Sequence, residues 1–224
     1  MTQSKIAIEA RGISKSYRAG NDDQSILENL DIQVHAGEFV VILGRSGSGK
    51  TTLLNLLGAM DHPDRGHIAL GGTRIGRSES ERSRIRRQHI GFVFQSFNLI
   101  PTLTVMENLA LPLQLSGSEI SDQPFNLLQR LGLLDMRDRY PNELSGGEQQ
   151  RVAIARAAIH QPVVIIADEP TGNLDLENGR KVVALLDEFV RERQTALVMA
   201  THSRDVMGYA DRVLRIENGH LLPA

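Results

Sequence analysis

Short, continuous apolar runs are the most prominent pattern along this chain. They are rich in β-branched residues and lie at Phe39–Leu43, Ile90–Phe94, Val163–Ala167 and Ala196–Ala200. Such strands are buried on both faces, which is typical of a mainly parallel sheet covered by helices. Stretches with helical spacing lie between them, at Lys50–Ala59, Glu148–His160 and Gly179–Arg193. The alternation of strand and helix predicts an α/β fold.

Two other regions depart from this pattern. Near the amino terminus, alternating segments at Ile6–Ile8, Gly12–Tyr17, Leu30–Val34 and Gly66–Leu70, with turn residues at Ala19–Asp23, predict an antiparallel β patch beside the parallel sheet. The stretch from Asn98 to Asn142 is rich in leucine at helical spacing and holds four prolines. We expect it to form an inserted helical sub-domain.

Composition narrows the range of functions. The chain has 224 residues, and its 25 Lys and Arg against 27 Asp and Glu give a net charge of −2. This balance provides no bulk field for binding nucleic acid. The absence of cysteine excludes disulfides, thiolate metal sites and cysteine nucleophiles. The sequence shows no signal peptide, and its apolar runs are far shorter than the roughly 18 residues of a membrane span. We therefore expect a soluble, cytosolic protein.

The strongest chemical signal is a match to G-x-x-x-x-G-K-[ST]. It consists of Gly44, Arg45, Ser46, Gly47, Ser48, Gly49, Lys50 and Thr51. The match follows a predicted strand and opens a predicted helix, which is the context that a phosphate-binding loop requires. Its backbone amides can surround phosphate oxygens, Lys50 can reach the β- and γ-phosphates, and the Thr51 hydroxyl can bind Mg²⁺. A nucleotide triphosphate with Mg²⁺ is the predicted ligand.

Polar residues also follow the other predicted strands. Asp168 and Glu169 end one strand, Gln95 ends a second, and His202 follows a third. Ligands of open parallel sheets bind at the carboxyl ends of the strands, so we expect these groups to converge on the phosphate loop. Asp168 can hold Mg²⁺ through water, and Glu169 can polarise an attacking water as a general base.

The segment Leu144–Gln149 (LSGGEQ) predicts a capped helix start that can also bind an anion. Ser145 and Glu148 have the spacing of a capping box. Gly146 and Gly147 leave backbone amides bare at the start of the helix, which makes a second anion site. A single bound nucleotide does not obviously require two phosphate-binding helix starts in the same chain.

Together these motifs resemble the nucleotide-binding subunit of an ATP-binding cassette (ABC) transporter, and the resemblance spans essentially the whole chain. LSGGEQ between a phosphate loop and an Asp-Glu strand is specific to this family. The resemblance implies a P-loop NTPase core (the RecA-like core) with a flanking antiparallel β patch. It also implies one ABC ATPase domain over residues 1–224, with the core at 1–96 and 160–224 and the helical signature sub-domain at 97–159.

The resemblance also implies roles for individual residues. Tyr17 matches the aromatic residue that stacks on adenine, and Thr52 extends the phosphate loop. The residues Ser145, Gly146, Gly147 and Glu148 match the signature, which contacts the γ-phosphate bound to the opposite subunit. Two copies of the chain are then expected to close head-to-tail in an ATP-sandwich dimer.

Five further residues match the catalytic motifs of the family. Gln95 matches the glutamine that touches Mg²⁺ and the attacking water, and Glu169 matches the catalytic glutamate. Asp175 lies in a match to the D-loop, and His202 matches the histidine that holds the γ-phosphate. Asp168 matches the Mg²⁺-binding aspartate. The implied reaction is hydrolysis of ATP to ADP and phosphate.

The finer pattern is similar to the lipoprotein-release, macrolide-export and cell-division branch (LolD/MacB/FtsE-like). That branch implies a separate membrane permease, docked over Phe97–Leu103, and a force-transmitting role in export or extraction. The location implied is the cytoplasm, peripheral on the inner face of the cell membrane. Arg45 stands where many relatives have proline, and its side chain is expected to be exposed.

Two other classes of function are weighed against this interpretation. A non-transport ABC ATPase acting on nucleic acid or the ribosome typically carries a coiled-coil insertion, zinc modules or two cassettes, and this chain shows none of these features. The arginine-rich segment Arg77–Arg87 is interrupted by Glu79 and Glu81, and we expect a solvated helix face there rather than a nucleic-acid site. A small-molecule kinase has no need of LSGGEQ.

Overall fold

The main sheet of the computed structural model has six strands and is almost entirely parallel. The structure describes residues 5–19, 22–119, 121–203 and 205–224. The strand order is β10-β9-β3-β8-β7-β6, and β10 alone pairs antiparallel, at one edge. The strands are β3 (Phe39–Leu43), β6 (Ile90–Phe94), β7 (Val164–Asp168), β8 (Ala196–Thr201), β9 (Arg212–Glu217) and β10 (His220–Pro223).

A second, antiparallel sheet confirms the predicted β patch. Its order is β2-β1-β4-β5, with β1 (Ile6–Ala19), β2 (Asp22–His35), β4 (Arg65–Leu70) and β5 (Thr73–Arg74). The two separate segments expected before Tyr17 are one long strand, β1, whose register shifts along its length. Of the expected turn at 19–23, residues 20 and 21 lie outside the described ranges.

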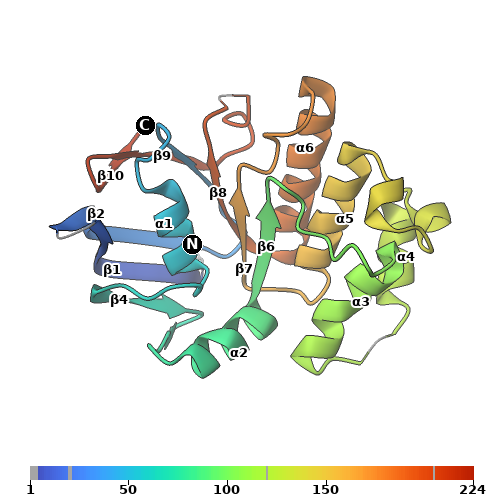
Figure 1. The fold of residues 1–224 in the computed structure, drawn as a ribbon, viewed down its shortest axis with the longest axis horizontal. Helices are drawn as coiled ribbons and strands as arrows, with labels where there is room; N and C mark the ends of the chain where they lie inside the picture. The colour runs from blue at the N-terminus through green and yellow to red at the C-terminus, as the bar shows by residue number, and fades with distance from the viewer. Residues whose placement is uncertain (1–4, 20–21, 120, 204) are drawn as a thin grey trace.

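Six α-helices complete the described part of the chain. They are α1 (Lys50–Leu57), α2 (Glu79–His89), α3 (Val105–Ser116), α4 (Gln123–Arg130), α5 (Gly146–Ala158) and α6 (Leu176–Arg193), with short 3₁₀ turns at Leu134–Met136 and Pro141–Glu143. In Figure 1, α5 and α6 lie beside the parallel strands, α3 and α4 lie beyond α5, and α1 lies on the side of the antiparallel sheet. In the described ranges, no helix is long and apolar enough to cross a membrane.

Two apolar cores cover the two faces of the parallel sheet. Successive side chains of a strand point to opposite faces, so Val164 and Ile166 of β7 pack in the core that contains α1, whereas Ile165 and Ala167 pack in the core that contains α5 and α6. All four are at most 2% exposed. The continuous apolar runs therefore reflect burial on both faces, as the sequence predicts.

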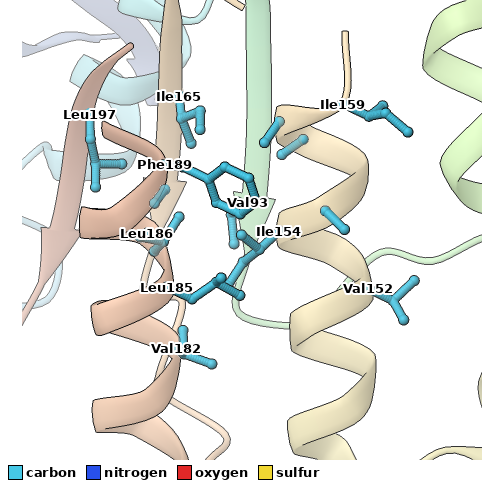
Figure 2. Close-up of a cluster of buried hydrophobic side chains, with 14 of the residues drawn as sticks. Val93, Val152, Ile154, Ile159, Ile165, Val182, Leu185, Leu186, Phe189 and Leu197 are labelled. Carbon is cyan, nitrogen blue, oxygen red and sulfur yellow. The ribbon is translucent and has the colours of Figure 1, made fainter. Parts of the chain in front are cut away.

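The contact between α5 and α6 fixes the position of the LSGGEQ helix. Figure 2 shows Phe189 and Leu185 of α6 pointing toward Ile154 of α5, with Val93 of β6 close by. Phe189, Ile154 and Val93 are fully buried. Complete burial of such a side chain contributes about 1.5–3 kcal/mol. The helix that carries the signature is thus held rigidly against the sheet.

Several boundaries differ from those expected. Helix α1 ends at Leu57, because Ala59 has a left-handed φ of 55°. Helix α6 begins at Leu176, not Gly179, because the Asp175 side chain accepts a hydrogen bond from the Asn178 amide and starts the helix earlier. Strand β7 includes Asp168 as its last residue. Strands β9 and β10 were not expected from the sequence.

The arginine-rich helix α2 is less solvated than predicted. Arg82 is only 8% exposed and pairs with Glu79 across one helical turn. Arg86 binds the other oxygen of Glu79 and the carbonyl oxygen of Ala59. Arg86 therefore fastens α2 to the chain just after α1, and the expectation of a simple solvated face is wrong for Arg82 and Arg86.

Candidate active site

The ends of the parallel strands bring the predicted polar residues together. The register pairs Phe94 with Asp168, Asp168 with Ala200, and Leu43 with Thr201, so β6, β7, β8 and β3 end at one edge. A cavity of about 530 Å³ opens there. It is lined by Ile26, Ser46, Gly47, Gly49, Lys50, Thr51, Thr52, Gln95, Asp168, Glu169 and His202. A second cavity, of about 830 Å³, includes Gly44, Arg45 and Ser48 in its lining.

The phosphate loop is shaped for an anion. Gly49, which precedes α1, has a φ of 102° that residues with a Cβ rarely adopt. Lys50 is 9% exposed, and its Nζ donates to the carbonyl oxygens of Gly44 at 2.7 Å and Arg45 at 3.2 Å. The first amides of α1 have no intrahelical acceptor. The Arg45 side chain is exposed, as expected.

A phosphate group fits the polar atoms of this loop. Among the described residues, the buried hydroxyl of Ser48 is one of a few side-chain groups with no hydrogen-bond partner. It lies in the same loop as the Lys50 ammonium and the open end of α1. A bound phosphate would supply acceptors for all of these donors.

Thr51 and Asp168 form the pair expected to hold Mg²⁺. The Thr51 hydroxyl donates to Asp168 Oδ2 at 3.0 Å. Burial raises the pKa of Asp168, and the neighbouring charge of Glu169 raises it further, while the Thr51 hydrogen bond and the Lys50 charge act in the opposite direction. Hydroxyl and carboxylate oxygens are the hard donors that Mg²⁺ binds beside substrate phosphates. The pair therefore fits Mg²⁺ by its chemistry.

Gln95 lines the cavity but is engaged elsewhere. Its side-chain amide donates to Asn173 Oδ1 at 3.1 Å, and Asn173 returns a hydrogen bond to the Gln95 carbonyl oxygen at 3.0 Å. We refer to this pair as the Gln95–Asn173 clasp. It joins the end of β6 to the loop after β7, and the sequence assigned Asn173 no role of its own.

Glu169 and His202 form a second pair. His202 Nδ1 lies 3.0 Å from Glu169 Oε2, and the His202 amide donates to the same oxygen at 3.3 Å. Glu169 has a left-handed φ of 46°, held by hydrogen bonds from its amide to Ala200 and from Gly172 to its carbonyl. A non-glycine residue in this conformation costs about 1–3 kcal/mol, and such strain is typical of functional positions. The carboxylate is thereby aimed into the cavity edge beside His202.

The LSGGEQ segment begins α5 as predicted. The Glu148 amide donates to Ser145 Oγ at 3.4 Å, and the Ser145 amide donates to Glu148 Oε2 at 2.8 Å, which completes the capping box. The hydrogen bonds from the Ser145 side chain and amide lower the pKa of Glu148. Within the described residues, the lining of the two phosphate-loop cavities includes no part of Ser145–Glu148.

Asp175 and Tyr17 lie at the margins of the site. Asp175 caps α6 and lines a separate cavity of about 280 Å³ that His202 shares. Tyr17 is 41% exposed, and of the described residues it is not among those lining the phosphate-loop cavities. Its hydroxyl does interact with Thr52, which lines the smaller of the two. Tyr17 is therefore adjacent to the nucleotide cavity.

Two polar residues of α5, one fully buried and one half-buried, were not identified from the sequence. Gln150 is fully buried and donates to the Pro170 carbonyl oxygen at 2.6 Å. Arg156 donates to the carbonyl oxygens of Phe97 at 3.1 Å and Asn98 at 2.7 Å, both of which have left-handed backbones. Polar residues at core-facing helical positions are a signal that could have found them.

Comparisons with known proteins agree with this geometry. The family model described as ABC transporter matches residues 27–172. The lipoprotein-releasing system ATP-binding protein LolD of Psychrobacter arcticus is 44% identical over 218 residues, covering 95% of this chain and 96% of LolD. The macrolide export ATP-binding/permease protein MacB of Rhodopirellula baltica is 43% identical over 95% of this chain, which spans 32% of that longer protein.

A solved structure extends the likeness to the whole fold. An ATP-binding cassette, solved as a dimer in a post-hydrolysis state bound to ADP and Pi, superposes with a TM-score of 0.87 and 37% identity, covering 96% of both chains. The relatives match the LolD/MacB-like branch that the motifs resemble. The chain belongs to the ABC transporter family, as an ATPase cassette that binds ATP with Mg²⁺.

Proposed function

We propose that this chain drives a membrane permease by hydrolysing ATP in a head-to-tail dimer. One observation carries the dimer: the capped start of α5 lies outside the lining of the cavities formed by the chain's own phosphate loop. In a head-to-tail pair, Ser145, Gly146, Gly147 and Glu148 of one copy complete the site of the other. The dimeric relative supports this arrangement.

Each residue at the strand edge then has a role that its geometry supports. Lys50 and the loop amides stabilise negative charge on the phosphates, as preorganised donors do. Thr51 and Asp168 would hold Mg²⁺, which would supply positive charge beside the phosphate oxygens. Glu169 accepts a proton from the attacking water, and His202 fixes the Glu169 carboxylate and reaches the γ-phosphate. Gln95 would reach the metal and the attacking water once its hydrogen bonds with Asn173 are broken.

We propose that the permease docks over Phe97–Leu103. The segment carries half-buried apolar side chains beside the exposed Pro101 and Thr102. The fully buried Asn108 pins it: its side chain accepts from the Ile100 amide and donates to the carbonyl oxygens of Ile100, Leu103 and Thr104. A segment whose backbone is fixed in this way can bind a helix of a partner protein. Arg156 links the same segment to α5.

Further features belong to the same proposal. The helical sub-domain is taken as residues 97–159 and the core as 1–96 and 160–224. The protein is placed peripherally at the cell membrane through its permease, in an export or extraction system of the kind that the names of LolD and MacB describe. Nucleic acid is not part of the proposed function.

The dimer is tested with Glu169→Gln protein. The variant keeps the shape of the side chain but cannot act as a base, so turnover should fall by about 10²–10⁴ while ATP binding persists. Light scattering should then show a dimer only with MgATP. Adding Ser145→Arg to the same chain should prevent the dimer without weakening ADP binding. A Glu169→Gln protein that stays monomeric in saturating MgATP would contradict the composite site.

The docking segment is tested by affinity purification from detergent-solubilised membranes. Tagged Glu169→Gln protein with ATP should retain a permease, identified by mass spectrometry. Adding Thr102→Arg should abolish its recovery, whereas Gln114→Arg, at the exposed far end of α3, should not. Undiminished recovery with Thr102→Arg would move the docking site elsewhere.

A further inference from the structure

Three charged or polar side chains converge beside the nucleotide cavity, and two of them, Lys15 and Asp61, were assigned no role by the sequence. Lys15 and Tyr17 lie two residues apart on β1 and so share one face of the strand. Asp61 lies in the loop between α1 and β4. Its carboxylate contacts both of them: Lys15 Nζ is 2.8 Å from Asp61 Oδ2, and the Tyr17 hydroxyl donates to the same oxygen at 3.2 Å. We refer to these three residues as the Lys15–Asp61–Tyr17 cluster.

Lys15 is an unusual residue to find buried. It is 7% exposed, and burial of an ammonium is costly unless acceptors surround it. Here Nζ also donates to the His62 carbonyl oxygen at 3.0 Å and lies 3.6 Å from Asp64 Oδ1. Burial acts to lower the pKa of Lys15, but the hydrogen bond and charge of Asp61 outweigh it and raise the pKa. The cluster keeps a permanent cation inside the fold.

That cation lies over the ring of Tyr17. Lys15 Nζ is 5.3 Å from the ring centroid, within the range of a cation–π interaction. The ring therefore has one face against Lys15 and its hydroxyl end against Asp61. Burial by itself favours the neutral carboxyl, but the hydrogen bonds from Lys15 and the His62 amide outweigh it and lower the pKa of Asp61. An ionised Asp61 is thus available to both partners at neutral pH.

The loop that carries Asp61 is itself fastened to β1. The Ser16 amide donates to Asp64 Oδ2 at 2.8 Å, and the Asp64 amide donates to the Ser14 carbonyl oxygen at 2.9 Å. Asp61 consequently has a fixed position relative to Tyr17. Tyr17 also interacts with Thr52 of α1, whose neighbours bind phosphate in the proposed function.

We propose that Asp61 and Lys15 are positioning residues that hold the Tyr17 ring as a preformed platform for the nucleotide base. The proposal rests on the proposed ATPase function and on the role that the family resemblance implies for Tyr17, stacking on adenine, and it extends that role. A ring that is already immobile loses less entropy when a base stacks on it. Loosening the ring should therefore weaken binding of the base by about 2- to 10-fold and leave binding of the phosphates unchanged.

The test separates the base from the phosphates. Dissociation constants for MgADP and for magnesium pyrophosphate are measured by calorimetry, since neither ligand is hydrolysed here. Tyr17→Ala should weaken ADP binding by about 5- to 100-fold, the range for loss of one base–aromatic stack, and leave pyrophosphate binding unchanged. Tyr17→Phe keeps the ring and removes only its hydroxyl, and Asp61→Asn removes the charge. Both should weaken ADP alone, by the smaller factor.

Controls and outcomes keep the two proposals apart. Glu188→Gln removes an exposed carboxylate that pairs with Arg130, and it should alter neither ligand. If Tyr17→Ala weakens ADP but Tyr17→Phe and Asp61→Asn do not, the positioning proposal fails and the role of Tyr17 stands. If Tyr17→Ala leaves ADP binding unchanged, both fail. Equal losses of affinity for ADP and for pyrophosphate would indicate a general structural defect and overturn the proposal. If Asp61→Asn does not fold, Tyr17→Phe alone tests the positioning role.

Discussion

The Asp168 carboxylate should strengthen binding of Mg²⁺ but lower the stability of the ligand-free fold. The substitution Asp168→Asn tests this directly. The change preserves shape, and an asparagine oxygen can still accept the Thr51 hydrogen bond seen at 3.0 Å. What it removes is a charge that is partly buried beside a second carboxylate, Glu169. Burial, with the Glu169 charge added to it, raises the pKa of Asp168. Ionisation of Asp168 is therefore less favourable in the folded, ligand-free protein than in the unfolded chain.

The sign of the effect follows from proton linkage. A carboxyl whose pKa is raised on folding contributes stability that is present below its unfolded pKa and is lost as the pH rises through its folded pKa. Without ligand at pH 7–8, Asp168→Asn should raise the free energy of unfolding by about 1 kcal/mol, a typical gain at a functional position. For a chain of this length the melting temperature should rise by about 2–4 °C. The gain should shrink as the pH falls through the folded pKa of Asp168.

With Mg²⁺ and nucleotide bound, the wild-type protein should become more stable than Asp168→Asn. Bound ligand at about 100 times its dissociation constant adds about 2.7 kcal/mol to the wild-type protein. The variant lacks one proposed metal ligand and should gain much less. Thermal unfolding is measured in EDTA and in MgADP across pH, with Asp138→Asn, an exposed aspartate, as the matched control. A variant no more stable than wild type in EDTA at neutral pH, or a gain that persists unchanged in acid, would refute the reasoning.

Two further predictions concern the supports of the site. Gly91→Ala on β6 would place a Cβ 2.2 Å from the Ala157 carbonyl oxygen of α5, so urea unfolding should show a loss of about 1–3 kcal/mol, whereas Gly208→Ala, which meets open space, should have little effect. Equal stability of the two variants would contradict the close packing of α5. Arg156→Met removes both hydrogen bonds to Phe97 and Asn98, and should cost about 1–3 kcal/mol in urea unfolding while MgADP affinity stays unchanged. A variant as stable as wild type would show that Arg156 does not hold this segment.

The local pattern of apolar and polar residues was enough to predict the central sheet and the phosphate loop of this protein. Burial on both faces imposes an unbroken apolar run on each central strand, so the parallel sheet could be predicted from Phe39–Leu43 and Val163–Ala167. The phosphate loop that ends in Lys50 was identified together with the strand before it and the helix after it, because these three parts follow one another directly in the sequence. Convergence of Gln95, Asp168 and His202 followed from topology, since parallel strands end at one edge. Capping of α5 by Ser145 was also predicted, because a cap is a three-residue interaction.

Only the tertiary structure decided the contacts that join distant segments. Asp61 binds the hydroxyl of Tyr17 across 44 positions of the chain, and Asn173 holds Gln95 across 78. Strand β9 escaped prediction because Arg212, Arg215 and Glu217 interrupt its apolar residues, so it lacks the unbroken apolar run of the central strands. Helix and strand patterns record which side of a segment is buried, and that information is local. Which polar atom meets which depends on how the finished elements pack, and no single segment encodes it.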